Sequence, residues 1–324
     1  MTSSPTELPE CWGHRGASAA FPENTLASFE RAIHDGAEGI ESDIHLSADN
    51  VILMFHDPDL SRTIGVKGYI KDLPWYGPEG MEHLRTKKEP RQPIPTFAET
   101  VAFLMQVSAI PFPYLPALNP CKPGNRHVSF NVDVKPHSDA KQIFTLMSEI
   151  ITAQPDWQTE LAPRILLGLW HPSYLPVAKS ILPYCRRSYL GVSVSIARRY
   201  FWDDCDTFSI VMPALSNREG QQFIAECKKN GKRIMVWTVN DPNRMVEACR
   251  WGVDVILTDV TKTWLDLRET LQADFPLVSA KYSRRFLWTS PFFWTPIIIL
   301  LHYISDWYFT RVVGPWETKE ETKA

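Results

Sequence analysis

Short apolar runs alternate along most of the chain with segments in which apolar residues recur at helical spacing. The runs that predict strands are 11–14, 37–45, 51–55, 128–134, 165–170, 188–192, 208–211, 233–236 and 253–257. The segments with helical periodicity are 26–33, 96–106, 139–152, 173–181, 220–230, 242–251 and 261–273. Asn24 is expected to cap the first helix. The gap between 37–45 and 51–55 is too short for a parallel crossover, so these runs predict an antiparallel hairpin or two strands with an unusual link.

The order of these elements indicates the fold. Regular strand–helix alternation over about 265 residues is what a (β/α)8 TIM barrel requires. A doubly wound open sheet is the alternative, but it would usually carry a Gly-rich phosphate loop where this chain has His14-Arg15-Gly16. We predict a TIM barrel over residues 1–280, with loop insertions at 57–95 and 111–124. A basic flank, a hydrophobic helix and a polar tail are expected to follow at 281–324.

Three carboxylates stand near the ends of the predicted strands. Glu41 and Asp43 lie two residues apart, so a strand presents both on the same face. Asp133 belongs to a later strand, and the carboxyl ends of barrel strands converge on one mouth. Burying three carboxylates together is costly unless a cation pairs with them, and Mg²⁺ and Ca²⁺ prefer oxygen ligands. The sequence therefore predicts a site for one divalent cation, Mg²⁺ or Ca²⁺.

Basic side chains accompany these carboxylates. His14 and His56 each follow an apolar run, and two histidines beside a bound cation suit general acid and base catalysis. Lys135 and Arg15 would hold anionic oxygens, since arginine matches phosphate geometry well. Any one of these residues alone is more often structural. The complete set predicts an active site at the barrel mouth.

The stretches around these residues resemble a known family, the glycerophosphodiester phosphodiesterases. Its opening signature is similar to Gly13-His14-Arg15-Gly16, Pro22-Glu23-Asn24-Thr25, Glu41-Ser42-Asp43 and His56-Asp57-Pro58-Asp59-Leu60-Ser61-Arg62-Thr63. Its closing strands are similar to Trp237-Thr238-Val239-Asn240 and Thr258-Asp259. The resemblance covers about residues 10–270. It implies a TIM barrel and hydrolysis of glycerol-containing phosphodiesters.

The resemblance also implies roles for particular residues. His14 and His56 would be the general acid and base. The metal ligands would be Glu41, Asp43 and Asp133, although many family members carry Glu where this chain has Asp133. Trp237 would line the substrate mouth or serve as a core aromatic at a strand end. The mechanism implied is attack on phosphorus by a free glycerol hydroxyl of the substrate, followed by opening of the cyclic phosphate by water.

The C-terminal region has a different character. Residues 286–305 carry no formal charge and follow the basic residues Lys281, Arg284 and Arg285. At about 1.5 Å per residue, such a helix would be roughly 30 Å long, the thickness of a membrane's hydrocarbon core. Flanking basic residues and aromatics such as Trp307 are usual interfacial anchors. We expect membrane attachment, either spanning or within one leaflet, with the barrel on the cytosolic side. A buried C-terminal helix is the alternative.

Composition adds bounds on location and partners. A net charge of −3 gives no reason to expect nucleic acid as a partner. The six cysteines are widely spaced without a C-x-x-C pair, which indicates reduced thiols facing the cytosol. Residues 1–10 lack the basic and apolar parts of a secretory signal. Attachment to an endoplasmic reticulum, mitochondrial or lipid-droplet surface fits these features.

This combination of barrel, tail and reduced thiols resembles the fungal phosphatidylglycerol phospholipase C group. The resemblance implies cleavage of phosphatidylglycerol to diacylglycerol and glycerol phosphate. The first alternative is a phosphodiesterase acting on soluble, deacylated glycerophosphodiesters, in which the tail only sets location. The second is a non-catalytic lipid-binding protein, which the complete set of histidines and carboxylates disfavours.

Overall fold

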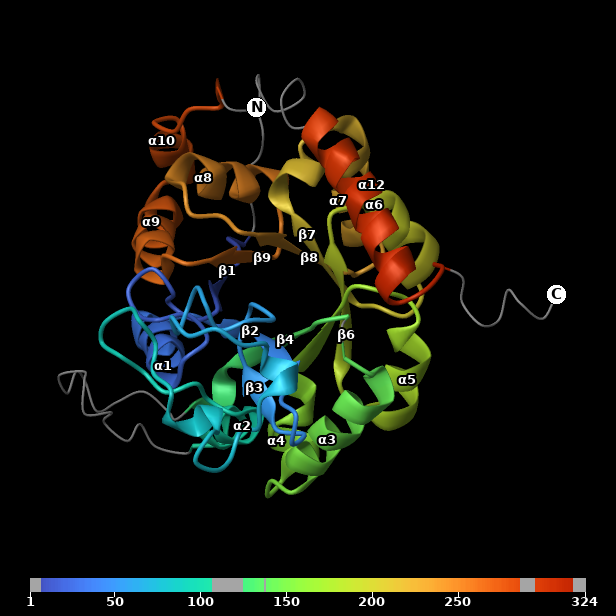
Figure 1. The fold of residues 1–324 in the computed structure, drawn as a ribbon. Coiled ribbons are helices and arrows are strands. Elements are labelled where there is room, and N and C mark those ends of the chain that lie inside the picture. The colour runs from blue at the N-terminus through green and yellow to red at the C-terminus, as the bar shows by residue number, and fades with distance from the viewer. Residues whose placement is uncertain (1–6, 107–124, 137, 286–294, 317–324) are drawn as a thin grey trace.

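The structure, a computed structural model, describes residues 7–106, 125–136, 138–285 and 295–316. In this part of the chain, nine strands form one sheet in the order β1-β9-β8-β7-β6-β5-β4-β2-β3. The sheet closes into a barrel because β1 also pairs with β2, and its neighbours are parallel except for the antiparallel pair β2–β3. The predicted TIM barrel of eight parallel strands is confirmed, as is the hairpin (Figure 1).

Each predicted apolar run overlaps one strand. The strands are β1 (Glu10–His14), β2 (Gly39–Leu46), β3 (Ile52–Met54), β4 (Ser129–Val134), β5 (Ile165–Leu169), β6 (Arg186–Gly191), β7 (Thr207–Val211), β8 (Arg233–Trp237) and β9 (Val255–Thr258). Parallel strands covered by helices on one side and packed inward on the other are apolar along most of their length, which made them visible in the sequence.

Helices surround the barrel and fill the outer layer in Figure 1. They are α1 (Leu26–Asp35), α2 (Phe97–Leu104), α3 (Ala140–Thr152), α4 (Trp157–Glu160), α5 (Tyr174–Ile181), α6 (Val194–Ile196), α7 (Arg218–Lys229), α8 (Pro242–Trp251), α9 (Thr261–Ala273), α10 (Phe275–Ser279) and α12 (Thr295–Val312). The sequence did not predict α4, α6 or α10, because helices of five residues or fewer are too short to display a helical period.

The start of α1 differs from the prediction. Thr25, not Asn24, is the N-cap, and it forms a reciprocal capping box with Ser28. Asn24 adopts a left-handed conformation with φ of 56° and is buried. Its side-chain amide donates a hydrogen bond to Asp43 Oδ2 at 3.0 Å, and its oxygen accepts one from Ser42 at 2.6 Å. The expectation that Asn24 caps the helix was wrong, because this side chain instead supports a carboxylate of the site.

The barrel interior changes from apolar to polar along the strands. Trp12, Leu166, Met235, Val255 and Leu257 form a buried cluster inside the barrel. The ring of Trp12 lies so close to Gly39 that a Cβ there would sit 2.3 Å from it, which requires glycine at that position. Since side chains two residues apart share a face, the next inward layer consists of residues such as His14, Glu41 and Trp237 at the mouth.

The predicted insertion at 57–95 packs against β3 and Phe55 and forms a second, smaller core with them. This core consists of Leu53, Phe55, Leu60, Ile64, Ile70, Trp75, Met81 and Ile94. Short 3₁₀ turns, η1 (Ile70–Asp72) and η2 (Met81–His83), lie within the insertion. Lys88 fastens the insertion to the loop after β1, donating from Nζ to the carbonyls of Ser18, Ala19 and Phe21 at 2.7, 2.8 and 3.0 Å. The other predicted insertion, 111–124, lies outside the described residues.

The C-terminal helix α12 lies across loops at the mouth of the barrel (Figure 1). Its Phe309 is buried against Trp170 and His171, which follow β5. It also contacts the turn η6 (Met212–Leu215) after β7. Of the hydrophobic segment expected at 286–305, the part 286–294 lies outside the described residues. Within the described ranges, no helix has both the length and the apolar character needed to cross a bilayer.

Candidate active site

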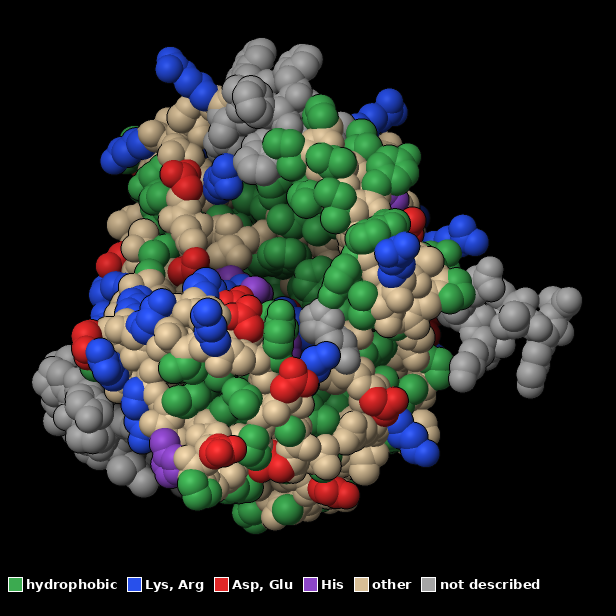
Figure 2. All heavy atoms as spheres, viewed as in Figure 1, with side chains coloured by type: hydrophobic (Ala, Val, Ile, Leu, Met, Phe, Trp, Pro, Cys, Tyr) green, Lys and Arg blue, Asp and Glu red, His purple; other side chains and the backbone are tan. Residues whose placement is uncertain are grey.

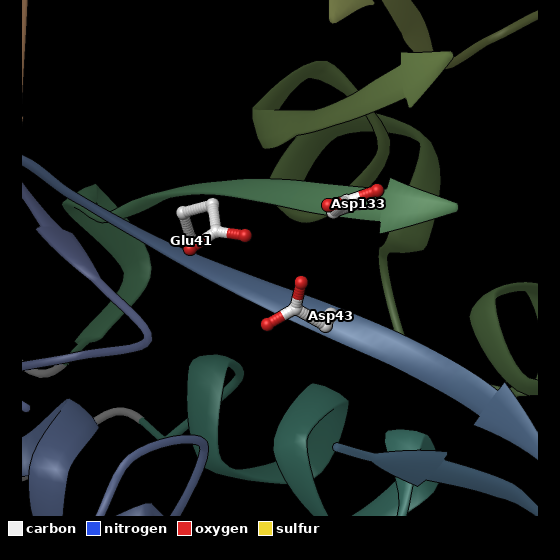
Figure 3. A group of neighbouring side chains, drawn as sticks. All are labelled: Glu41, Asp43 and Asp133. Atoms are coloured by element: carbon white, nitrogen blue, oxygen red, sulfur yellow. The ribbon is translucent and has the colours of Figure 1, made fainter. Parts of the chain in front are cut away.

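The three predicted metal ligands lie together at the mouth of the barrel (Figure 3). Asp43 of β2 pairs in register with Asp133 of β4, and Glu41 precedes Asp43 by two residues on the same face. One carboxylate oxygen from each residue lies within 4.8 Å of the others. All three side chains are buried. The strand register therefore brings residues that are 90 positions apart in sequence into a single oxygen-lined site.

The electrostatics of this site fit a divalent cation. Lys135 Nζ lies 2.6 Å from Asp43 Oδ1 and 2.5 Å from Asp133 Oδ2, so these carboxylates have a cationic partner. Within the described residues, the hydrogen-bond donor to Glu41 is the backbone N–H of Arg15, at 3.0 Å. Burial, and then the charge of Asp43, raise the pKa of Glu41 to about 8. A hard cation would neutralise this repulsion, and its preferred ligands are oxygens of this kind.

His14 approaches the cluster from β1. Its Nδ1 lies 2.7 Å from Asp259 Oδ1, which leaves Nε2 as the nitrogen not engaged by that carboxylate. Asp259 is itself held by Ser18 Oγ at 2.8 Å and by Asn240 Nδ2 at 2.6 Å. Although burial opposes the charged form, the hydrogen bond that the His14 ring donates to Asp259 raises the pKa of His14. This histidine is therefore oriented and biased toward the protonated form.

His56 follows β3 and also lies beside the cluster. Its Nδ1 lies 2.8 Å from Asp57 Oδ1, and its Nε2 is 4.0 Å from Asp43 Oδ1. Burial lowers the pKa of His56, because it disfavours the imidazolium. His45 also bonds the backbone carbonyl of His56 at 3.0 Å. The site thus holds two histidines, each oriented by a carboxylate, with their pKa values displaced in opposite directions.

A chain of ion pairs joins His56 to Arg15. Asp57 Oδ2 accepts from Arg62 Nε at 2.5 Å, and Arg62 donates to both oxygens of Glu23 at 2.6 and 2.7 Å. Glu23 in turn accepts from Arg15 Nη1 at 3.0 Å. Arg15 Nε lies 3.3 Å from Asp43 Oδ2, so its guanidinium is beside the cluster. This network places a fixed positive charge where a phosphate would meet the carboxylates.

An aromatic wall lines the mouth on the side of α12. We define it as Trp170, Trp237 and Phe309, whose ring centroids are separated by 6.1 Å (Trp170–Trp237) and 5.9 Å (Trp170–Phe309). The indole N–H of Trp237 is buried, and no described residue accepts a hydrogen bond from it. Figure 2 shows a hollow at the mouth, with apolar side chains toward α12 and charged side chains and histidine opposite. A substrate there would meet a charged side and an apolar side.

Seven of the eight predicted site residues form one cluster. These are His14, Arg15, Glu41, Asp43, His56, Asp133 and Lys135. The structure places the eighth, Trp237, on the aromatic wall. The roles assigned to these eight residues stay predictions. Sequence reasoning missed the partners that orient them: Asn24, Asp57, Arg62, Trp170 and Asp259. Most of them belong to the stretches that resemble the family signature. Their spacing in the sequence does not show which side chain each of them contacts.

We expect Asp259 to control the pH dependence of any chemistry that uses His14. Replacing Asp259 with asparagine removes the charge that stabilises the His14 imidazolium, so the pKa of His14 falls. The rate of a step that needs protonated His14 should then begin to fall at a lower pH than in the wild type. The measurement is the alkaline limb of kcat against pH, which should move to lower pH in Asp259→Asn. Asp266→Asn, on the outer face of α9, is the control and should leave the limb in place.

Comparison with known proteins agrees with this architecture. Residues 14–263 match the glycerophosphoryl diester phosphodiesterase family. A glycerophosphodiester phosphodiesterase of Caldanaerobacter subterraneus subsp. tengcongensis is 25% identical over 265 residues, which are 78% of this chain and 95% of that protein. One from Bacillus altitudinis is 23% identical over 272 residues, covering 82% of this chain and 100% of that protein.

Solved structures confirm the fold. A phosphodiesterase of Oleispira antarctica in complex with its product sn-glycerol-3-phosphate has a TM-score of 0.63 at 22% identity, covering 80% of this chain and 96% of that one. A glycerophosphodiester phosphodiesterase of Parabacteroides distasonis has a TM-score of 0.65 at 21% identity, with 82% and 98% covered. A closed barrel with histidines beside an oxygen-donor cluster has the parts of a hydrolytic enzyme. This chain belongs to the glycerophosphoryl diester phosphodiesterase family and is a phosphoric diester hydrolase.

Proposed function

We propose that the protein hydrolyses glycerophosphodiesters, releasing glycerol phosphate and an alcohol. The observation that carries this proposal is that His14 and His56 both lie beside one carboxylate cluster, His14 in register with Glu41 and His56 near Asp43, each oriented by its own aspartate. Two such histidines can take a proton from the attacking oxygen and give one to the leaving oxygen. Family membership and the product in the Oleispira antarctica structure support the same substrate class.

In this proposal, each group of site residues has its own role. Glu41, Asp43 and Asp133 would hold one divalent cation, Mg²⁺ or Ca²⁺, which when bound supplies Lewis-acid stabilisation of the phosphoryl oxygens. Arg15 and Lys135 add positive charge beside the same oxygens. One histidine deprotonates the free glycerol hydroxyl that attacks phosphorus, and the other protonates the departing alkoxide. Water then opens the cyclic phosphate with the two histidine roles exchanged.

A substrate panel tests this proposal. Purified protein with Mg²⁺ or Ca²⁺ is incubated with glycerophosphocholine, glycerophosphoethanolamine and glycerophosphoglycerol, and products are followed by phosphorus NMR. Glycerol phosphate should form from all three, because the reacting glycerol phosphate unit is common to them. Absence of glycerol phosphate with every diester and either cation would refute the proposal. The alternative of a non-catalytic lipid-binding protein predicts that outcome.

We further propose that α12 holds the mouth against a membrane surface. One face of α12 packs on the barrel through Phe309, so the other face is what the helix can present. That face exposes large apolar side chains: Ile297, Ile299, Leu300, Leu301, Tyr303, Ile304, Trp307 and Val312. Arg311 stacks on Trp307 at 5.0 Å, giving the basic and aromatic pairing usual at membrane interfaces. A helix in this position would bring the mouth close to lipid head groups.

This surface favours phosphatidylglycerol as a second candidate substrate. Its head-group glycerol carries the hydroxyl that the mechanism requires, and cleavage would release diacylglycerol and glycerol phosphate. The diacylglycerol side would face the aromatic wall. Vesicles that contain phosphatidylglycerol, assayed beside the soluble diesters, separate the two candidates. Turnover of soluble diesters alone would exclude the lipid as a substrate and leave the first proposal standing.

We expect substitutions on the exposed face of α12 to reduce membrane binding. Leu300→Lys places a charge where 59% of the side chain is exposed, so the fold should tolerate it while insertion into lipid becomes unfavourable. Leu277→Lys, on α10 with 61% exposure, is the matched control. Co-flotation with anionic vesicles should fall for Leu300→Lys and stay at the wild-type level for Leu277→Lys. Equal flotation of all three proteins would count against α12 as the membrane-binding surface.

A further inference from the structure

Trp170 makes a direct contact with a candidate metal ligand. Its indole N–H donates a hydrogen bond of 2.6 Å to Asp133 Oδ1. The other oxygen, Oδ2, lies 2.5 Å from Lys135 Nζ. The two partners therefore set the rotation of the Asp133 carboxylate between them, and with it the direction in which its free lone pairs point. Hydrogen bonds of this kind to a ligating carboxylate orient the ligand and tune metal affinity.

The C-terminal helix in turn confines Trp170. The ring of Phe309 lies 5.9 Å from that of Trp170 and Trp237 lies 6.1 Å away, so the indole is flanked by two aromatic rings. Phe309 is 6% exposed, and it is the one fully buried side chain among the α12 residues whose exposure the structure describes. It also contacts His171 and Trp316. The most buried side chain of α12 in the described part of the helix is thus the one that packs against Trp170.

We infer that Trp170 is a positioning residue for Asp133 and that α12 holds it in place through Phe309, which makes the C-terminal helix part of the active site. The inference rests on the proposed metal-dependent function. A side chain that must keep an N–H on one oxygen loses rotamer freedom, and dense packing around the ring reduces that loss on metal binding. Without Phe309, the indole gains free space on the α12 side. The carboxylate it orients then has more directions to sample.

Metal affinity tests the role of Trp170. In the full-length protein, Trp170→Phe keeps an aromatic ring against Phe309 but removes the donor to Asp133. Isothermal titration with Mn²⁺ or Mg²⁺ should show a 10–100-fold weaker affinity, the usual effect of losing an outer partner of a metal ligand. Hydrolysis should recover when the cation is raised to saturation. Trp157→Phe is the control, because Trp157 lies on α4 and packs against Tyr184, and the metal affinity of this variant should match that of the wild type.

A second pair of variants tests the role of α12. Phe309→Ala should weaken metal affinity, whereas Tyr303→Ala, on the exposed face of the same helix, should not. The double variant Trp170→Phe/Phe309→Ala should bind the metal ion as tightly as Trp170→Phe does. Both substitutions act through the same hydrogen bond, so their effects on metal affinity should not add. Circular dichroism of each variant reports whether the barrel is folded.

Two results would overturn the inference. Wild-type metal affinity in folded Trp170→Phe would remove the positioning role, and wild-type affinity in Phe309→Ala would remove α12 from the site. These titrations contain no substrate, so they stand apart from the proposed function. A protein that hydrolyses no glycerophosphodiester could still show the predicted pattern, and an active one could fail to show it.

Discussion

Replacing either His14 or His56 with alanine is expected to lower kcat for a glycerophosphodiester by about 10²–10⁴-fold, the usual contribution of general acid–base catalysis. Each imidazole lies beside the carboxylate cluster, and an aspartate engages its Nδ1. Removing either leaves one of the two proton transfers without a partner. The Michaelis constant should change far less, because in the proposed mechanism Arg15, Lys135 and the cation would bind the phosphate.

The matched control is His83→Ala. His83 lies in the insertion that follows His56, but its side chain is 66% exposed and pairs with the neighbouring Glu82. The activity of the His83→Ala variant should equal that of the wild type. Thermal unfolding should show that the His14→Ala and His56→Ala barrels remain folded. If either site variant keeps near-normal kcat, that histidine has no part in the proton transfers.

Removal of divalent cations is expected to abolish hydrolysis, and Mg²⁺ or Ca²⁺ should restore it. Lys135 balances Asp43 and Asp133 without a metal ion, but Glu41 forms no ion pair within the described residues, and burial raises its pKa to about 8. In the metal-free protein a proton therefore competes with the cation at Glu41. Metal affinity should increase from about pH 6 to about pH 8 as that proton is lost.

The measurement is calorimetric titration at several pH values, alongside activity after exhaustive chelation and dialysis. Glu41→Gln removes the negative charge at similar volume, so it should bind the cation weakly and lose the pH dependence of binding. Glu99→Gln, in the capping box of α2 and away from the mouth, is the control. Full activity in the dialysed wild type would contradict the metal assignment.

The fold and most of the site were predictable for a physical reason. Strand residues two apart share a face, so Glu41 with Asp43, and Asp133 beyond them on β4, could be placed at one mouth before any contact was known. The hairpin of β2 and β3 followed from the short link between them. These features depend only on local periodicity and on the geometry of parallel strands.

The orienting partners were not predictable in this way. Asn24 has the sequence character of an N-cap, but the left-handed backbone at that residue turns its side chain to Asp43 and leaves the cap to Thr25. Asp259 meets His14 across 245 positions, a contact that only closure of β1 on β9 creates. Trp170 has the sequence character of a core aromatic. Its hydrogen bond to Asp133 depends on the register between β4 and β5.

The sequence alone could not show how the C-terminal segment is placed. Its apolar run was compatible with either a membrane segment or a buried helix, and the two were treated as alternatives. In the structure, α12 buries Phe309 against the barrel while Leu300 and Trp307 stay exposed. One face of this helix is therefore buried against the barrel, and another face exposes apolar side chains. Which residue would face inward depended on the position of Trp170, far away in sequence.

The central claim is that this site cleaves glycerophosphodiesters by using the substrate's own glycerol hydroxyl. The most direct measurement is single-turnover phosphorus NMR with glycerophosphocholine and its 2-deoxyglycerol analogue, with the cation at saturation. The natural diester should give glycerol phosphate. The deoxy analogue should bind but react very slowly, since an intramolecular nucleophile is worth an effective concentration of up to about 10⁵–10⁸ M. Equal rates for the two diesters, or no reaction of the natural one, would contradict the claim.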